Sequence, residues 1–273
     1  IIYKDGEVFV SYTEDRGNDK TSTSIARGII RDESFSEIEN IFQSDSSWNN
    51  IHWGSRLMFK DDLLYASIGE RGHGSVAQDP TSYFGKMIRI NKDGSAPKDN
   101  PYADNEGWLP EIYQIGLRNP QGIILNPQDD EIYITNHGPR GGDFFGKVEA
   151  GTNYGWADVA WGGIDYDGSI IGDGSAWKEG LLKPIYTWVP SIAVSDMTFY
   201  GGDLFPELKN KILVTSLKAQ RLISLEFDGK KARNETTLFE KVGRVRDVET
   251  NSAGEIYVII DNEDSGIWKL VNK

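Results

Sequence analysis

The chain has 273 residues, carries a formal net charge of −13 and contains no cysteine. Its acidity argues against nucleic acid and anionic membranes as partners, and the lack of cysteine excludes disulfides and thiolate zinc sites. No run of about 18 apolar residues occurs, so the sequence predicts no transmembrane segment.

Short alternating or β-branched segments, bounded by Gly, Asp, Asn or Pro, run along the whole chain, and helical periodicity is nearly absent. One pattern recurs: an apolar run, a polar turn, then a strand of Ile, Leu or Val with a tyrosine. In chain order, residues 5–12 fit the second half of a copy, and further copies occupy residues 56–68, 122–135, 196–215 and 247–260.

Repeats that start about 50 to 75 residues apart in an all-β chain are typical of radial blades with loop insertions. The sequence therefore predicts an all-β fold, a β-propeller, in a single domain over residues 1–273. A β-sandwich explains the hairpins equally well, but it does not explain their recurrence.

Two neighbouring motifs indicate a site that binds an anion beside a metal. Residues 116–122 read Gly-Leu-Arg-Asn-Pro-Gln-Gly, in which proline and glycines restrict the backbone around Arg118. Residues 136–143 read Asn-His-Gly-Pro-Arg-Gly-Gly-Asp, a turn of unhindered carbonyls that ends in a carboxylate. Such oxygen donors suit a hard cation such as calcium.

Four more residues have both a functional and an ordinary explanation. Lys218, Arg244 and Arg246 lie at the ends of repeats, where propeller loops line one mouth of the channel, but a solvated basic edge explains them too. Arg244 and Arg246 are two residues apart, so on an extended strand they point to the same side. His52 is a candidate general base, because histidine titrates near neutral pH, although a lone histidine beside a tryptophan is more often structural.

Further motifs follow one another in a specific order along almost the whole chain. They occupy residues 51–57 (Ile-His-Trp-Gly-Ser-Arg-Leu), 67–72 (Ser-Ile-Gly-Glu-Arg-Gly), 77–79, 85–91, 93–95, 99–102, 153–156 (Asn-Tyr-Gly-Trp), 216–218 (Ser-Leu-Lys) and 243–247 (Gly-Arg-Val-Arg-Asp). In this order they resemble the soluble PQQ-dependent aldose sugar dehydrogenases of the glucose/sorbosone dehydrogenase family. That family consists of six-bladed β-propellers that bind pyrroloquinoline quinone (PQQ) and calcium.

The resemblance implies the reaction and the residues that carry it. His52 would take the proton of the anomeric hydroxyl of an aldose, the C1 hydride would pass to PQQ, and an aldonolactone would form. Calcium would polarise the quinone carbonyl, and Arg118 would stabilise the charge that develops there. The implied catalytic residues are His52, Arg118 and Glu70. The implied cofactor residues are Arg118, Asn119, Gln121, Ser191, Lys218, Arg244 and Arg246. The implied metal ligands are Gly138, Pro139, Asp143 and Tyr154, and Trp53 and Trp188 are expected to contact substrate.

The sequence departs from the family pattern at several of these positions. Glu70 replaces the usual aspartate and reaches one methylene further, Leu117 stands where a histidine is common, and Asn136 stands where a glutamate precedes the histidine. Ser191 occupies a threonine-like cofactor position and keeps the hydroxyl. A second, structural calcium site would use Asp143 and Tyr154, but its usual glutamate is Phe144 here.

The resemblance also sets expectations about partners and completeness. It implies aldose sugars as substrates, a quinone or cytochrome-like electron acceptor other than oxygen, and a periplasmic or secreted location. Only about four and a half repeats are visible, so we expect either an upstream blade or an unusual closure between residues 1–2 and 268–270.

Two alternative functions stay open: a calcium-dependent propeller lactonase, and a non-catalytic propeller whose Trp53, Trp161 and Trp188 stack on sugars.

Overall fold

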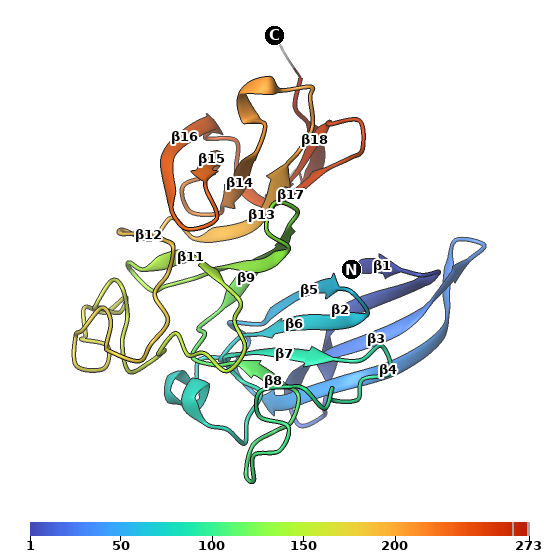
Figure 1. Ribbon diagram of the computed structural model, residues 1–273, viewed down its shortest axis with the longest axis vertical. Coiled ribbons are helices and arrows are strands. Elements are labelled where there is room, and N and C mark those ends of the chain that lie inside the picture. Colours follow the sequence, from blue (N-terminus) through green and yellow to red (C-terminus); the bar gives the residue numbers. More distant parts are fainter. Residues whose placement is uncertain (264, 272–273) are drawn as a thin grey trace. The chain divides into compact units, whose positions relative to one another are not determined.

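The computed structural model describes residues 1–263 and 265–271, whose strands form five antiparallel sheets (Figure 1). In every sheet, strands that are consecutive in the chain are neighbours, as in the meander of a propeller blade. The prediction of an all-β β-propeller is confirmed. The described helices are two 3-10 turns, Gly74–Gln78 and Pro206–Leu208, and neither is long enough to cross a bilayer.

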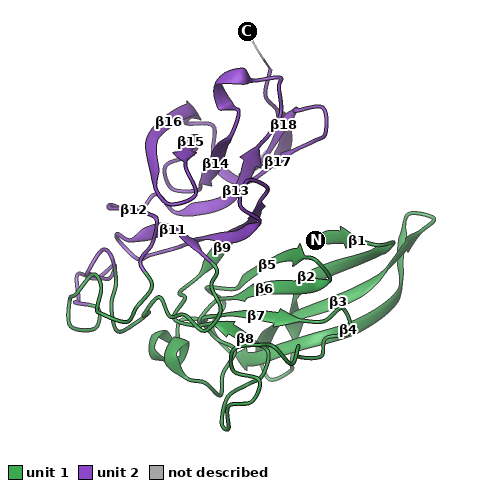
Figure 2. Ribbon diagram, viewed as in Figure 1, with its two compact units in different colours: residues 1–120, 148–160, 171–182 green, residues 121–147, 161–170, 183–273 purple. Residues whose placement is uncertain are grey.

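The chain divides into two compact units, each built from segments that are discontinuous in sequence (Figure 2). Unit 1 comprises residues 1–120, 148–160 and 171–182. Unit 2 comprises residues 121–147, 161–170 and 183–273. A single domain over residues 1–273 stays a prediction, and each unit is described separately below.

Unit 1 contains two four-stranded sheets. The strands of the first are β1 (Ile2–Lys4), β2 (Glu7–Asp15), β3 (Thr21–Arg31) and β4 (Ser34–Ser47). The strands of the second are β5 (Gly54–Lys60), β6 (Leu63–Ile68), β7 (Lys86–Ile90) and β8 (Ile112–Gln114).

The first sheet corrects the repeat count. Residues 5–12, expected to be the second half of a copy, instead form the first turn and the start of the second strand of a complete sheet. The sequence pattern missed β3 and β4, which are rich in serine and threonine, and much of β4 is exposed. A strand without an apolar run gives no signal to a search for apolar runs.

The core of unit 1 lies between its two sheets. Phe9 of β2 and Phe59 of β5 meet edge to face with ring centroids 5.0 Å apart. All five residues of β7 and the last five of β6 are buried. Strands with both faces covered lose the polar alternation of a solvent-facing strand, which is why residues 63–68 read as a nearly continuous apolar run. β7 is also buried, although it contains Lys86 and Arg89.

Unit 2 contains three sheets. The first has β9 (Pro120–Asn126, whose first residue belongs to unit 1), β10 (Glu131–Asn136), β11 (Asp143–Lys147) and β12 (Tyr186–Trp188). The second has β13 (Val194–Tyr200), β14 (Lys211–Ser216), β15 (Arg221–Phe227) and β16 (Ala232–Glu240). The third has β17 (Arg244–Thr250), β18 (Ile256–Asp261) and β19 (Gly266–Lys269).

Two apolar clusters hold unit 2 together. One joins the first two sheets through residues such as Phe145 of β11 and Val214 of β14, and the other joins the last two through Leu213 and Val258. Neighbouring residues of β14 thus serve two different cores, because successive side chains of a strand point to opposite faces. The middle sheet is therefore packed on both faces, as the blade prediction requires.

Candidate functional site

His52 and Glu70 form a hydrogen-bonded pair in unit 1. The Nδ1 atom of His52 bonds to Oε1 of Glu70, and the side chains are 18% and 2% exposed respectively. The other carboxylate oxygen, Oε2, accepts the backbone N–H of Gly74 at 2.7 Å. A carboxylate at Nδ1 fixes the tautomer that leaves Nε2 as the basic nitrogen. The sequence-predicted base and its acidic neighbour are thus brought together.

The turn that carries His52 is packed directly on the strand end that carries Glu70. His52 has a φ of +52°, and the N–H of Gly69 donates to the carbonyl of Trp53 at 3.1 Å. A Cβ at Gly69 would lie 1.9 Å from the carbonyl oxygen of His52, so only glycine allows this approach. The side-chain oxygen of Asn119 accepts the N–H of Gly54 at 3.2 Å. Asn119, expected to orient the cofactor, therefore also supports the His52 turn.

Arg71, a residue without a predicted role, holds the same turn through hydrogen bonds to its backbone. It is fully buried, and its guanidinium donates to the carbonyls of Asn49 and Ile51, the latter at 3.0 Å. It also donates to Oγ1 of Thr21 at 3.0 Å. Burial lowers the pKa of Arg71 to about 10, and the group stays charged at neutral pH. The Gly-Glu-Arg-Gly motif at residues 69–72 could have indicated this role, because two adjacent charged residues between glycines fit a tight, buried turn.

Arg118 is buried in unit 1, with its Cζ atom 5.3 Å from the ring centroid of Trp156. The segment around Trp156 is held by an amide pair, in which Nδ2 of Asn153 donates to Oε1 of Gln78 at 2.7 Å. Nε2 of Gln78 also donates to the carbonyl of Trp156 at 2.6 Å. The marker segments 77–79 and 153–156 are therefore packed together, and they fix one face of the Arg118 side chain.

The turn at residues 136–143, in unit 2, is closed by Asp143. Its two carboxylate oxygens accept the backbone N–H groups of Gly138, at 2.9 Å, and Val194, at 3.0 Å. Burial raises the pKa of Asp143, and these hydrogen bonds only partly oppose the shift. The N–H of Asp143 donates to the hydroxyl of Ser191 at 3.3 Å. Ser191, a predicted cofactor residue, and the predicted calcium turn thus share one hydrogen-bonded unit.

The other two predicted metal ligands, Pro139 and Tyr154, lie in different units. Pro139 is buried in the same turn as Gly138. Tyr154 is buried in unit 1, whereas Asp143 belongs to unit 2, so the structure does not test whether the two share an ion. Phe144, which replaces the usual glutamate, is buried. The predicted second calcium site therefore lacks this carboxylate.

The predicted cationic triad lies in unit 2. Lys218, on the turn after β14, and Arg244 are exposed, and Arg246 is half-buried. Arg246 contacts Oδ2 of Asp261 at 2.6 Å, and Arg244 approaches the same oxygen at 3.6 Å. The two arginines therefore point to the same side, as their spacing predicted. Asp261, whose pKa is lowered first by the hydrogen bond from Arg246, had not been anticipated.

The two tryptophans expected at the substrate are packed against other groups. Trp188 is 5% exposed, and its indole N–H donates to Glu235 at 2.7 Å. Trp53 is half-buried, and Arg71 covers one of its faces. Gln121, the remaining predicted cofactor residue, lies half-buried at the start of β9. The roles of these three residues stay predictions.

The donor chemistry fits an anionic cofactor and a hard cation. Within unit 2, Arg244 and Arg246 share one acid, Asp261, so the two guanidinium groups exceed their common carboxylate by one charge and can bind an anionic group. The turn at residues 136–143 offers backbone carbonyl and carboxylate oxygens and no thiolate, and such oxygens are the donors that calcium prefers.

A sequence model of one protein family, described as glucose/sorbosone dehydrogenase, matches residues 3–269. The chain belongs to that family. Within the glucose/sorbosone dehydrogenase family, its similarity to aldose sugar dehydrogenase YliI of Escherichia coli (strain K12) is 32% identity over 269 residues, covering 96% of this chain and 72% of that protein.

Two further proteins are similar to the chain. A crystal structure of glucose dehydrogenase superposes with a TM-score of 0.94 at 31% identity, covering 98% of this chain and 79% of that one. Quinoprotein glucose dehydrogenase B of Acinetobacter calcoaceticus is 33% identical over 185 residues, 58% of this chain and 37% of that protein. The family assignment and the fold therefore agree.

Proposed function

We propose that the chain is a PQQ- and calcium-dependent quinoprotein that oxidises the C1 hydroxyl of aldose sugars to aldonolactones. One observation carries the proposal: a half-buried histidine, His52, is held by a buried carboxylate, Glu70, in a turn that only glycine at position 69 permits. Membership of the glucose/sorbosone dehydrogenase family supports it, as does the similarity to a quinoprotein glucose dehydrogenase.

His52 would act as the general base. With Nδ1 held by Glu70, the Nε2 lone pair is available to take the proton of the anomeric hydroxyl. The carboxylate of Glu70 would then stabilise the imidazolium, and its second hydrogen bond, from Gly74, keeps it from rotating. The proton is thus held at Nε2 while the C1 hydride leaves the sugar.

Lys218, Arg244 and Arg246 would hold the carboxylates of the cofactor. When bound, PQQ supplies the ortho-quinone that accepts the hydride. Guanidinium groups bind carboxylates through two parallel hydrogen bonds, and the partial pairing of both arginines with Asp261 keeps them extended toward one side. Arg118, stacked near Trp156, would place its charge beside the quinone oxygen. Asn119, Gln121 and Ser191 would orient the ring system.

Calcium would be held by backbone carbonyls of Gly138 and Pro139. Asp143 would support the calcium site by shaping the turn, because each of its carboxylate oxygens already accepts a backbone N–H. The turn would thereby keep its carbonyls oriented in the absence of the ion. The electron acceptor would be a quinone or cytochrome-like partner rather than oxygen, and the location periplasmic or extracellular.

An absorbance titration tests the proposal. The purified chain is titrated with PQQ plus calcium, then given glucose and a dye acceptor. Stoichiometric binding, bleaching of the quinone and dye reduction are expected. His52→Ala should bind PQQ normally and lose about 10²–10⁴-fold in turnover, whereas His73→Ala, a histidine of the same unit that bonds Ser47, should keep it. Full turnover by His52→Ala would end the proposed mechanism.

A calcium-dependent sugar lactonase is the second candidate, because one group of side chains favours it. Asp196, Asp247 and Glu249 bring carboxylate oxygens within 4.8 Å of one another in unit 2. Hydrolysis of gluconolactone with calcium and without PQQ, abolished by Asp247→Asn, would support this candidate. A chain that needs PQQ for every sugar reaction would exclude it.

A further inference from the structure

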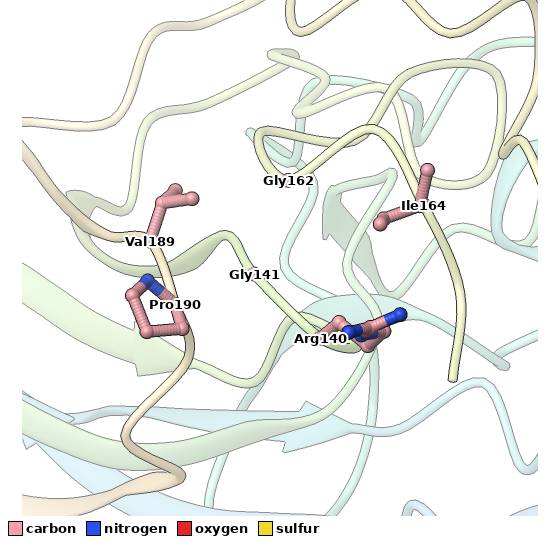
Figure 3. Close-up of a pocket in the computed structure, with 6 residues that line it drawn as sticks. All are labelled: Arg140, Gly141, Gly162, Ile164, Val189 and Pro190. Atoms are coloured by element: carbon pink, nitrogen blue, oxygen red, sulfur yellow. The ribbon is translucent and has the colours of Figure 1, made fainter. Parts of the chain in front are cut away.

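A pocket of about 250 Å³ opens in unit 2 beside the predicted calcium turn (Figure 3). Its six lining residues all belong to that unit, and Figure 3 shows Val189 and Pro190 on one side and Arg140 and Ile164 on the other. The volume is below the ~300–1,000 Å³ of pockets for drug-sized ligands. It suits one sugar ring.

Two glycines bring the backbones that line the pocket into direct contact. A Cβ at Gly162 would lie 2.4 Å from the carbonyl carbon and oxygen of Gly141, and one at Gly141 would lie 3.1 Å from Cγ1 of Val189. The loop at 161–170 is therefore pressed onto the 136–143 turn. Larger residues at either position would fill the space or separate the two segments.

Hydrogen bonds connect the remaining walls of the pocket. The N–H of Ser191 donates to the carbonyl of Arg140 at 2.9 Å, and the N–H of Gly142 donates to the carbonyl of Trp188 at 2.9 Å. The pocket thus shares its backbone with Ser191, a predicted cofactor residue, and with the turn that carries Gly138 and Pro139. A ligand here would sit next to the proposed cofactor position within this unit.

Arg140 differs from the other arginines that the structure describes in unit 2, all of which contact carboxylates. Arg221 and Arg233 hold carboxylates at 2.8 and 2.9 Å, respectively. Across residues 1–263 and 265–271, the exposed guanidinium of Arg140 makes neither an ion pair nor a hydrogen bond, and only its backbone carbonyl is engaged. In a chain with 42 acidic and 29 basic residues, a cation without an acid at the edge of a pocket is available to an external anion.

We propose that this pocket binds the anionic group of an acidic sugar, a carboxylate or a phosphate, through Arg140. The apolar walls, Ile164, Val189 and Pro190, would pack on the C–H face of the ring while the guanidinium forms two hydrogen bonds to the anion. The cofactor's carboxylates have their own three cations in Lys218, Arg244 and Arg246. The substrate preferred over glucose is then an aldose that bears an acidic group away from C1. This inference rests on the proposed sugar-oxidising function.

Calorimetric titration of the full chain without PQQ tests the pocket independently of turnover. The probes are glucose, glucuronate and glucose 6-phosphate, and the two acidic sugars distinguish carboxylate from phosphate. At least one of them should bind about tenfold or more tightly than glucose. Arg140→Gln should abolish the preference for the acidic sugar, whereas Arg140→Lys should keep part of that preference. Arg233→Gln, an equal charge change on the β15–β16 sheet, is the matched control.

Dye reduction with the same sugars and PQQ gives the second readout. The ratio of kcat/KM for the acidic sugar to that for glucose should fall about tenfold in Arg140→Gln and stay constant in Arg233→Gln. Equal binding of all three sugars to the wild type, or an acidic-sugar preference that survives Arg140→Gln, overturns the inference. If the binding preference is present but no sugar is oxidised, the dehydrogenase proposal fails and the pocket assignment stands.

Discussion

The guanidinium of Arg71 lies over the indole of Trp53, with Cζ 3.5 Å from the ring centroid. The same group donates to two carbonyls just before His52 in the chain, those of Asn49 and Ile51. One buried cation therefore holds the segment that presents His52, while Glu70, the preceding residue, holds the imidazole itself. Adjacent residues of one strand end thus control both the backbone and the ring of the proposed base.

Replacing Arg71 by methionine should destabilise the turn. The carbonyls of Asn49 and Ile51 would lose their donor and the ring of Trp53 would lose its cation, so we expect the free energy of unfolding to fall by about 2–4 kcal/mol. Urea denaturation measures this loss. Arg31→Met is the control, because that arginine is 70% exposed in an ion pair with Glu37 and its loss should cost no more than about 0.5 kcal/mol. Equal effects of the two substitutions would contradict the anchoring role.

Alanine at position 69 should separate the His52 turn from the strand end. Its Cβ would lie 1.9 Å from the His52 carbonyl oxygen, a distance that forces backbone movement. We expect turnover to drop by about 10²-fold, since a shift of about 1 Å misplaces the base. Gly201→Ala is the matched control, because its Cβ would meet only Phe199 at 3.7 Å. Normal turnover by Gly69→Ala would show that the turn position is unimportant.

Lys86 should make stability depend on pH. It is fully buried, and its Nζ donates to the carbonyls of Val76, Ala77 and Phe84 at 2.8–3.0 Å. Burial lowers its pKa to about 7, so between about pH 7 and the ordinary value of 10.5 the unfolded chain holds one proton more than the folded one. The free energy of unfolding should then rise with pH in that window, by up to ~1.4 kcal/mol per pH unit.

Denaturation of the wild type and Lys86→Met at pH 7.5 and 9.5 checks this dependence. The pH slope should be present in the wild type and lost in Lys86→Met. Parallel slopes in the two proteins would mean that the three carbonyls keep the ammonium charged throughout the range.

Replacing Arg246 by glutamine should weaken PQQ binding. One charge-assisted contact to a cofactor carboxylate is worth ~1.5–3 kcal/mol, so the dissociation constant should rise about tenfold or more. The absorbance titration measures it, with Arg233→Gln as the control that keeps the net charge equal. An unchanged dissociation constant for Arg246→Gln would remove the arginine from the cofactor site.

Several features of the fold and site were predictable because their signals are local. Apolar runs at residues 63–66 and 212–214 mark strands, since most residues of a buried strand are apolar whatever covers it. The spacing of Arg244 and Arg246 predicted that both side chains point to the same face of a strand, because strand periodicity depends only on neighbouring residues. The motifs at residues 51–57 and 116–122 likewise predicted the family.

Other features depended on residues far apart in the sequence. The polar strands β3 and β4 are specified by pairing with each other and with β2, and no short window reveals this. Asp261 reaches Arg246 only because β17 and β18 pair in the observed register. The sequence by itself determined the β-propeller class, the family and the identity of the proposed base. Only the tertiary structure decided what holds that base, and that Arg140 pairs with no acid in the part of the chain that the structure describes, because both depend on contacts that chain folding creates.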